Sequence, residues 1–187
     1  MQVRQLGLDG VVEIVPKKFG DSRGFFSETY SRAAFAAAGL CCDWVQDNQS
    51  FSAEKGVLRG LHFQLAPHAQ DKLVRVLRGS IFDVAVDIRT ASPTFGRWVS
   101  CVLSAAAWNQ LLIPRGFAHG FLTLEPATEV FYKVSARYAP ECDRAIRYDD
   151  PAIGITWPLD GTDPVLSDKD RKAPLLAETG GDFDFGL

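Results

Sequence analysis

Six short segments between residues 72 and 135 are rich in Val, Ile, Phe and Tyr, the residues that favour β-strands. They cover residues 72–77, 81–88, 95–103, 110–113, 117–124 and 130–135. Turn-forming residues at 78–79, 91–93, 114–116 and 125–126 separate most of them. Strands this short bury a core only when several of them pack together. The pattern therefore predicts an all-β fold, specifically a jelly-roll sandwich or barrel.

Two short helices are expected outside this region. Ser31 is a suitable N-cap for a helix over residues 32–38, and Gly39 is placed to end it. Ser167 followed by Asp170 resembles a capping box, with Asp in place of the preferred Glu or Gln, and predicts a second short helix there. Neither a low-complexity linker nor an internal repeat interrupts the chain, so residues 1–187 are predicted to form a single domain.

The composition narrows the functional class. The 187 residues are 47% hydrophobic and 23% charged, as in ordinary globular proteins, and the net charge of -3 argues against nonspecific nucleic-acid binding. The first thirty residues hold no apolar run of the length that a signal peptide or membrane span needs, which favours a cytoplasmic protein without membrane contact. The four cysteines form no C-x-x-C pair and are expected to be free thiols.

A histidine motif lies just before the predicted strands. Gly56, His62 and Gln64 have the spacing of the metal-binding cupin motif G-x5-H-x-H, with Gln in place of the second His. The next cupin ligand, a Glu, is replaced by Lys72, seven residues before Gly79. An ammonium adds positive charge where a divalent cation needs a negative ligand. We therefore expect no metal, and a histidine and a lysine that can move a proton and stabilise an oxyanion.

A second segment, residues 113–120, matches the other half of the cupin pattern, P-x-G-x-x-H, and ends near His119. Arg59 and His62 are three residues apart, so a regular strand would point them to opposite faces. Gly60 between them is expected to permit a bulge that turns both toward one cavity. His68, in a proline-rich loop, is expected to be solvated.

Charged residues in the predicted strands suggest partners and a ligand. Asp83 and Asp87 share one strand face, and at least one is expected to pair with an Arg or a His, because carboxylates are rarely buried alone. Several arginines near the predicted barrel would suit a phosphorylated ligand. They are Arg23, Arg59, Arg75 and Arg97.

These residues, together with strings along most of the chain, resemble the dTDP-4-dehydrorhamnose 3,5-epimerase family. The matching strings are residues 21–28, 46–48, 56–64, 72–76, 82–89, 94–96, 113–121, 132–133 and 166–170. The resemblance implies a metal-free, cofactor-free cupin jelly roll that acts on dTDP-4-dehydro-6-deoxy-D-glucose in dTDP-L-rhamnose biosynthesis. It also implies a homodimer, with the N- and C-terminal extensions packing on the barrel or on the dimer partner.

The resemblance implies four catalytic residues. His62 would be the base that removes the protons acidified by the C4 ketone, and Asp170 would orient and charge it, with Asp83 as the second candidate for that role. Tyr132 would be the acid on the far face of the sugar, and Lys72 would hold the developing enolate.

The same resemblance implies a set of substrate-binding residues. Arg23 and Arg59 would bind the diphosphate, with His119 close to the sugar or phosphate. Glu28, Gln46 and Asn48 would read the thymine and deoxyribose, while Phe26 and Tyr138 would offer stacking faces. Lys72 is expected to bind the substrate as well as to act in catalysis. Three further residues complete the substrate-binding set: Asp47, Asp143 and Lys169. Two positions depart from the family, which has Glu where Asp143 stands and Gly where Asp71 stands, and Asp71 is expected to point away from Lys72.

Three other functions remain open from the sequence. An epimerase acting at C3 or C5 alone would keep the same His and Tyr. A metal-dependent cupin oxygenase is disfavoured by Gln64 and Lys72. A noncatalytic module that binds nucleotide sugars would not need the complete set of proposed proton-transfer residues.

Overall fold

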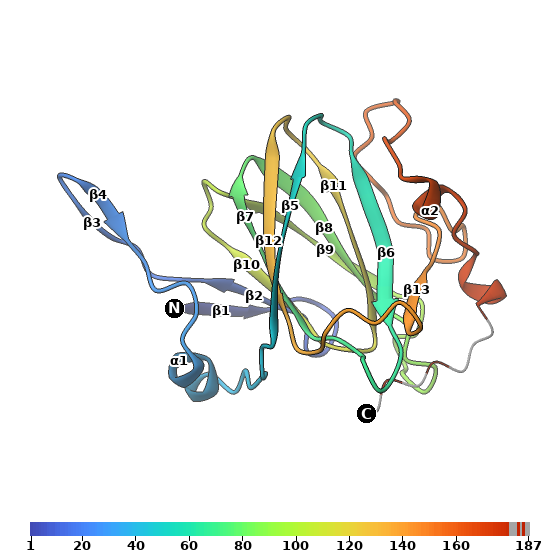
Figure 1. Ribbon diagram of the computed structural model, residues 1–187, viewed down its shortest axis with the longest axis horizontal. Helices are drawn as coiled ribbons and strands as arrows, with labels where there is room; N and C mark the ends of the chain where they lie inside the picture. The colour runs from blue at the N-terminus through green and yellow to red at the C-terminus, as the bar shows by residue number, and fades with distance from the viewer. Residues whose placement is uncertain (180–182, 184, 186–187) are drawn as a thin grey trace.

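The computed structural model describes residues 1–179, 183 and 185, and its main body consists of two antiparallel β-sheets that face one another (Figure 1). The six-stranded sheet has the order β1 (Gln2–Gln5), β2 (Val12–Val15), β10 (Gln110–Ile113), β7 (Lys72–Arg78), β12 (Thr128–Val134) and β5 (Gln46–Ser52). The five-stranded sheet has the order β13 (Asp143–Ala145), β6 (Leu58–Gln64), β11 (Phe117–Thr123), β8 (Ser80–Asp87) and β9 (Trp98–Ser104). The all-β jelly-roll prediction is confirmed.

The core lies between the sheets and continues behind the five-stranded one. Strand β8 shows why, because it is buried along nearly its whole length. Ile81 and Ala85 belong to the core cluster between the sheets, whereas Val84 and Val86 belong to a second cluster. Side chains alternate along a strand, so β8 packs on both faces. The second cluster includes Ile146, Ile153, Trp157 and Leu176, so the C-terminal segment covers the outer face of this sheet.

Both predicted helices are present. Helix α1 (Arg32–Ala37) starts after Ser31, whose side chain accepts from the Ala34 amide, and ends one residue earlier than predicted. Helix α2 (Asp168–Arg171) starts after Ser167, whose hydroxyl accepts from the Asp170 amide at 3.1 Å. A single 3-10 turn, η1 (Leu176–Glu178), follows. No helix in the described part of the chain is long and apolar enough to cross a membrane.

Strand β9 was predicted to begin at residue 95 and instead begins at Trp98. The buried carboxylate of Asp87 explains the difference. It accepts hydrogen bonds from the hydroxyls of Ser92 and Thr94, each at 2.6 Å, and from the Arg89 guanidinium. These contacts hold the segment before β9 in a turn, because the local side-chain bonds compete with strand pairing.

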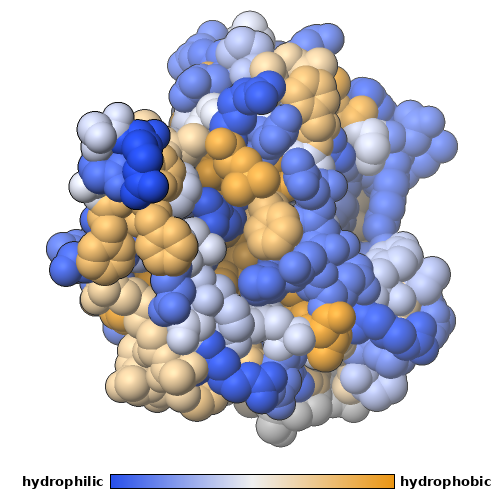
Figure 2. Space-filling view, turned by 60° about the vertical axis from the view of Figure 1, so that its left-hand side comes forward, coloured by the Kyte–Doolittle hydropathy of each residue, from blue (hydrophilic) through white to orange (hydrophobic). Residues whose placement is uncertain are grey.

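A hairpin of β3 (Phe19–Asp21) and β4 (Gly24–Phe26) extends away from both sheets (Figure 1). It is rich in exposed aromatic rings, since Phe19, Phe25 and Phe26 are 53%, 55% and 71% exposed. The face on which the hairpin comes forward shows orange, hydrophobic rings beside blue, hydrophilic residues (Figure 2). Trp108 anchors the base of the hairpin by stacking edge-on against Phe25 and donating its indole N–H to the hydroxyl of Ser27. An apolar projection of this kind is typical of a surface that another protein covers.

Candidate active site

Two adjoining cavities of about 380 Å³ and 270 Å³ share His62, Lys72 and Tyr132 in their walls. Lys72 lies on β7 and Tyr132 on β12 of the six-stranded sheet, while His62 lies on β6 of the other sheet. The first cavity is also lined by Gln46, Asn48, Phe63, Gln64, Gln70, Tyr138, Asp143 and Lys169. The second is also lined by Ser50, Arg59, His119, Phe121, Ser167 and Asp170. Together they form one site between the two sheets.

The predicted bulge at Gly60 is confirmed. His119 of β11 pairs with His62 of β6, and Phe121 pairs with Arg59, so β6 contains one residue more than β11 between these two pairs. Gly60 has a φ of 111°, and a Cβ atom there would lie 2.5 Å from the His119 carbonyl oxygen. Only glycine tolerates both conditions. The extra residue turns Arg59 and His62 into the same cavity.

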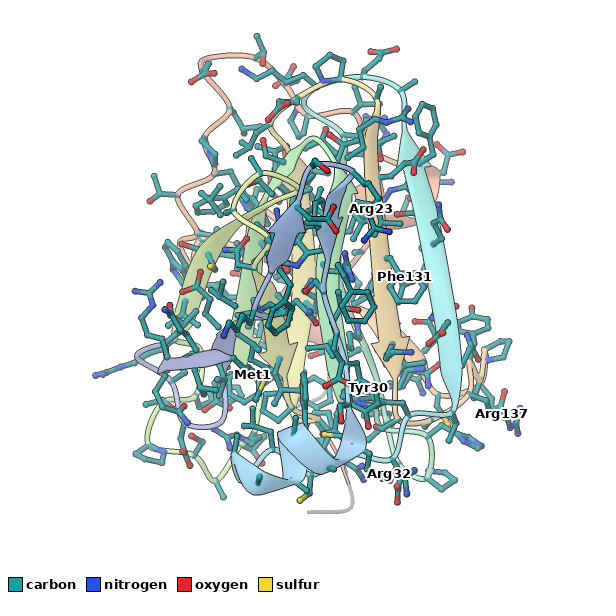
Figure 3. All side chains as sticks on the ribbon, turned by 90° about the vertical axis from the view of Figure 1, so that its left-hand side faces the viewer. Met1, Arg23, Tyr30, Arg32, Phe131 and Arg137 are labelled. Atoms are coloured by element: carbon teal, nitrogen blue, oxygen red, sulfur yellow. The ribbon has the colours of Figure 1, made fainter. Side chains whose placement is uncertain are left out.

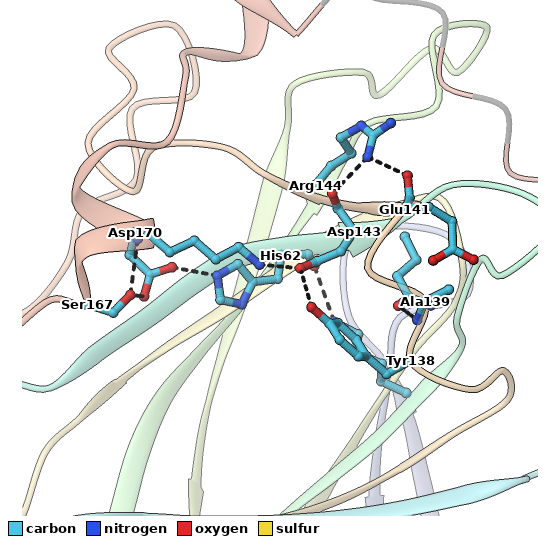
Figure 4. Close-up of polar contacts among 11 residues, drawn as sticks. His62, Tyr138, Ala139, Glu141, Asp143, Arg144, Ser167 and Asp170 are labelled. Atoms are coloured by element: carbon cyan, nitrogen blue, oxygen red, sulfur yellow. Dashed lines mark hydrogen bonds and ion pairs between the residues drawn. The ribbon is translucent and has the colours of Figure 1, made fainter.

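His62 forms a pair with Asp170 on α2, as Figure 4 shows. The His62 Nε2 and Asp170 Oδ1 atoms lie 2.5 Å apart, and the Ser167 hydroxyl donates to Asp170 Oδ2 at 2.8 Å. Burial alone would raise the pKa of Asp170, but the hydrogen bonds from His62 and Ser167 lower it below its ordinary value. The carboxylate is therefore ionised and can stabilise a charged imidazole.

Asp83, the second candidate for this pairing, instead contacts the other cavity histidine. Its Oδ1 lies 2.5 Å from His119 Nε2, and both side chains are almost completely buried. On β8, Asp83 pairs directly with Phe121, which makes His119 its diagonal neighbour across the sheet. Burial, followed by the charges of Lys72 and His62, lowers the pKa of His119 more than Asp83 raises it, so this imidazole is neutral.

Lys72 is buried at the cavity wall with one hydrogen bond, from its Nζ to the backbone carbonyl of His62 at 3.2 Å. Burial lowers its pKa to about 8, against the raising effect of the Asp83 and Asp143 charges. As predicted, Asp71 does not pair with Lys72. Its carboxylate accepts from Arg115 and from the hydroxyl of Ser135, each at 2.8 Å.

Tyr132 faces the cavities from the sheet opposite His62, and burial raises the pKa of its phenol. A group that holds its proton, opposite a histidine paired with a carboxylate, gives the site a proton donor on one wall and a base on the other.

The mouth of the larger cavity is formed by three polar side chains. Asp143 on β13 accepts from the Tyr138 hydroxyl at 3.1 Å and from the ammonium of Lys169 on α2 (Figure 4). Gln46 and Asn48, from alternate positions of β5, bond to each other at 2.8 Å nearby. Tyr138 is 54% exposed, so one face of its ring is free for a planar ligand.

Gln64, at the position of a cupin metal ligand, has a different task. Its amide group donates to the carbonyls of His68 and Arg137 and accepts from the Ala139 amide. The contacts to Arg137 and Ala139 hold the loop that carries Tyr138, and the contact to His68 ties it to the loop after β6. Within residues 1–179, 183 and 185, no group of three or more His, Cys, Asp or Glu side chains is arranged to hold a metal ion.

Some predicted site residues lie outside the cavities. Arg23, Phe26 and Glu28 belong to the projecting hairpin and its continuation, and Arg23 pairs with Asp21 there (Figure 3). Asp47 points away from the cavity between Gln46 and Asn48, and its carboxylate pairs with Lys133 at 2.9 Å. Alternation along β5 turns the Asp47 side chain outward, and substrate contact by these residues stays a prediction.

Three further basic residues considered from the sequence lie outside the cavities. Arg75 stacks over Trp108 rather than lining a cavity, Arg97 is exposed, and His68 contacts Arg137 away from the site. Five lining residues were not predicted from the sequence: Ser50, Phe63, Gln70, Phe121 and Ser167. Ser167 could have been found, because a helix cap next to a proposed catalytic carboxylate must lie beside it.

The chain is similar to known proteins along nearly its whole length. A family model described as dTDP-4-dehydrorhamnose 3,5-epimerase matches residues 5–178. The chain is 51% identical over 185 residues to the Sinorhizobium fredii protein of that name, covering 99% of this chain and 94% of that protein.

Two crystal structures are similar along nearly the whole chain. The dTDP-6-deoxy-D-glucose-3,5-epimerase of Legionella pneumophila, in complex with dTDP-4-keto-L-rhamnose, has a TM-score of 0.93 at 44% identity, covering 98% of this chain and 97% of that one. The dTDP-4-dehydrorhamnose 3,5-epimerase of Bacillus anthracis, with TDP and PPi bound, has a TM-score of 0.90 at 47% identity, covering 93% and 98%.

Proposed function

This chain belongs to the dTDP-4-dehydrorhamnose 3,5-epimerase family, and from that premise we propose which of its side chains carry out the reaction. The enzyme converts dTDP-4-dehydro-6-deoxy-D-glucose into dTDP-4-dehydro-L-rhamnose by inverting C3 and C5 of the sugar. The observation that carries the assignment of roles is the placement of His62 and Tyr132 on opposing sheets, across one cavity. Inversion needs a base on one face of each carbon and an acid on the other.

His62 is the base in this proposal. The C4 ketone acidifies the hydrogens on C3 and C5, and an imidazole accepts a proton near neutral pH. Its Nε2 is hydrogen-bonded to Asp170, so Nδ1 is the nitrogen left to accept the proton from carbon. The ionised Asp170 stabilises the imidazolium that forms and fixes the plane of the ring.

Lys72 stabilises the enolate, and Tyr132 returns a proton to the opposite face. Among the described residues only one of the three ammonium donors of Lys72 is used, and the others are available for the C4 oxygen. One well-placed enolate contact contributes on the order of 3 kcal/mol, about a hundredfold in rate. Inverting both carbons takes two protons from the sugar and returns two, so after each inversion His62 releases its proton to solvent and Tyr132 regains one from solvent.

The nucleotide half of the substrate occupies the mouth of the larger cavity. We assign Gln46 and Asn48 to the thymine and deoxyribose, and the exposed ring of Tyr138 to stacking on the base. Lys169 and Asp143 border the same space. Arg59 in the smaller cavity supplies the positive charge for the diphosphate.

Deuterium exchange tests this proposal. The enzyme is incubated with dTDP-4-dehydro-6-deoxy-D-glucose in heavy water, and NMR reads deuterium at C3 and C5. We expect label at both carbons, and we expect Tyr132→Phe to keep exchange at one carbon but lose the double inversion. Tyr148→Phe is the matched control, because Tyr148 packs behind the five-stranded sheet, outside the cavity. Label at one carbon only in the wild type would mean a single epimerisation, and label at neither would leave a binding module.

We also assign the projecting hairpin to the cavity of a second subunit in a homodimer. Its exposed phenylalanines and the distance of Arg23, Phe26 and Glu28 from their own cavity support this assignment. Such an arrangement makes each site depend on both chains.

Subunit complementation tests the shared site. Arg23→Ala and His62→Ala are each expected to be weakly active, whereas co-expression should restore activity, because one site of the mixed dimer regains both residues. A mixture of Lys72→Ala and His62→Ala serves as the control and should stay inactive, since both residues come from one chain. If the first mixture is no more active than its components, Arg23 does not act across the interface.

A further inference from the structure

The catalytic scheme above leaves one buried charged group without a task. Asp83 lies on β8, between β11 and β9, with none of its surface exposed. Its Oδ1 is bonded to His119, but its Oδ2 is buried without any hydrogen-bond partner in the described part of the chain. An unpartnered carboxylate oxygen inside a protein costs free energy, so such a group calls for an explanation.

The ammonium of Lys72, a cation in the same buried region, explains why a buried carboxylate stands at this position. Lys72 has its ammonium hydrogen-bonded to a neutral carbonyl, and no carboxylate of the described residues lies within 4.0 Å of it. A buried ammonium without a counter-charge tends to lose its proton. The charge of Asp83 is the largest influence opposing that loss, and it raises the pKa of Lys72 against burial.

Charged and titratable groups from five other elements surround Lys72, but only Asp83 on β8 offers it a negative charge that no cation neutralises. They are His62 on β6, His119 on β11, Tyr132 on β12, Asp143 on β13 and Lys169 on α2. Asp143 is the other carboxylate, but Lys169 neutralises it at the mouth of the cavity. Asp83 faces only a neutral imidazole, so its full charge remains available.

The Asp83 carboxylate also determines the tautomer of His119, that is, which ring nitrogen carries the proton. An ionised carboxylate accepts but does not donate, so the proton of the neutral imidazole resides on Nε2. Nδ1 then carries a lone pair and has no partner among the described residues, while the ring lines the smaller cavity. A bare ring nitrogen accepts a hydrogen bond from a hydroxyl and repels a phosphate, which has no proton to offer near neutral pH.

We propose that Asp83 is a positioning residue that provides the counter-charge for the Lys72 ammonium and holds His119 with its acceptor nitrogen toward a hydroxyl of the sugar ring. Asp83 itself does not touch the substrate. The part concerning Lys72 rests on the proposed role of that residue at the enolate.

The test compares Asp83→Asn with Asp87→Asn across pH. Asp87 is the matched control, because it is a second fully buried carboxylate on β8, yet Arg89, Ser92 and Thr94 satisfy it away from the cavity. For kcat/KM of the wild type, activity should fall above pH 8 as Lys72 loses its proton. Asp83→Asn should move this alkaline limb down by about one pH unit and lower kcat/KM at pH 8 about fivefold. Asp87→Asn should lower the melting temperature and leave the limb in place.

Nitrogen-15 NMR of histidine in the resting enzyme provides a readout that does not depend on turnover. The chain has three histidines, so substitution of His68 and His62 assigns the signals of His119. We expect Nδ1 unprotonated in the wild type and a mixture of tautomers in Asp83→Asn, because an amide can either donate or accept.

An unmoved alkaline limb, or an unchanged tautomer in Asp83→Asn, would overturn the proposal. Lys72→Ala measured in the same assay separates the two proposals. If that variant keeps full activity, the enolate role of Lys72 fails, whereas the NMR result still decides what Asp83 does to His119.

Discussion

The two histidine–carboxylate pairs of the cavity use the same atoms at the same distance and differ in their surroundings. In both, Nε2 lies 2.5 Å from Oδ1. The His62 side chain is 32% exposed and its carboxylate partner also binds Ser167. The His119 side chain is 9% exposed, and its carboxylate partner has no second bond within residues 1–179, 183 and 185. The comparison teaches that the geometry of a pair does not define a base, because the environment decides whether the histidine can accept charge.

The elements that carry the carboxylates reinforce this difference. Asp170 sits on α2, a single helical turn whose cap serine also bonds the carboxylate, so both of its oxygens are satisfied. Asp83 sits on β8 of the five-stranded sheet, where its direct cross-strand partners are Phe121 and Cys101. His62 is paired with an ionised carboxylate at the wall of the cavity, whereas an imidazolium at His119 would lie buried near Lys72.

The largest expected effect separates the two histidines. His62→Ala should lower kcat about a thousandfold, because it removes the general base, while dTDP affinity measured by calorimetry stays near the wild-type value. His119→Ala should lower kcat only about tenfold, the effect of one lost hydrogen bond to the sugar. Equal losses in the two variants would mean that both pairs transfer protons, and the comparison would fail.

A smaller loss of kcat is expected when the hydroxyl of Ser167 is removed, because only the His62–Asp170 pair has such a hydroxyl bonded to its carboxylate. Ser167→Ala removes the donor to Asp170 Oδ2 and the cap of α2, and should lower kcat about tenfold with a loss of about 1 kcal/mol in stability. Ser167→Thr keeps a hydroxyl at the same place and should recover most of the rate. If Thr restores the melting temperature but not kcat, Ser167 supports the helix without influencing the dyad.

Much of the β-sheet framework could be predicted, but strand β5 shows where prediction ends. Its sequence, Gln46 to Ser52, is almost entirely polar and carries no strand signal. The segment is a strand because it pairs along its whole length with β12. Its polar side chains at positions 46 and 48 line the cavity, so they carry no apolar pattern. The core strands were found because burial on two faces demands apolar residues, which leave a pattern in the sequence.

The sequence by itself determined the chemical content of the site: histidines at two cupin positions, a lysine and a glutamine where metal ligands would stand, and a glycine that permits the bulge at residue 60. Only the tertiary structure decided which carboxylate serves which histidine. Spacing along a strand tells which face a side chain occupies, but not which distant segment lies opposite. Asp170 reaches His62 across 108 residues of chain, and Asp83 reaches His119 through the register of β8 against β11, and both contacts arise only when the sheets pack.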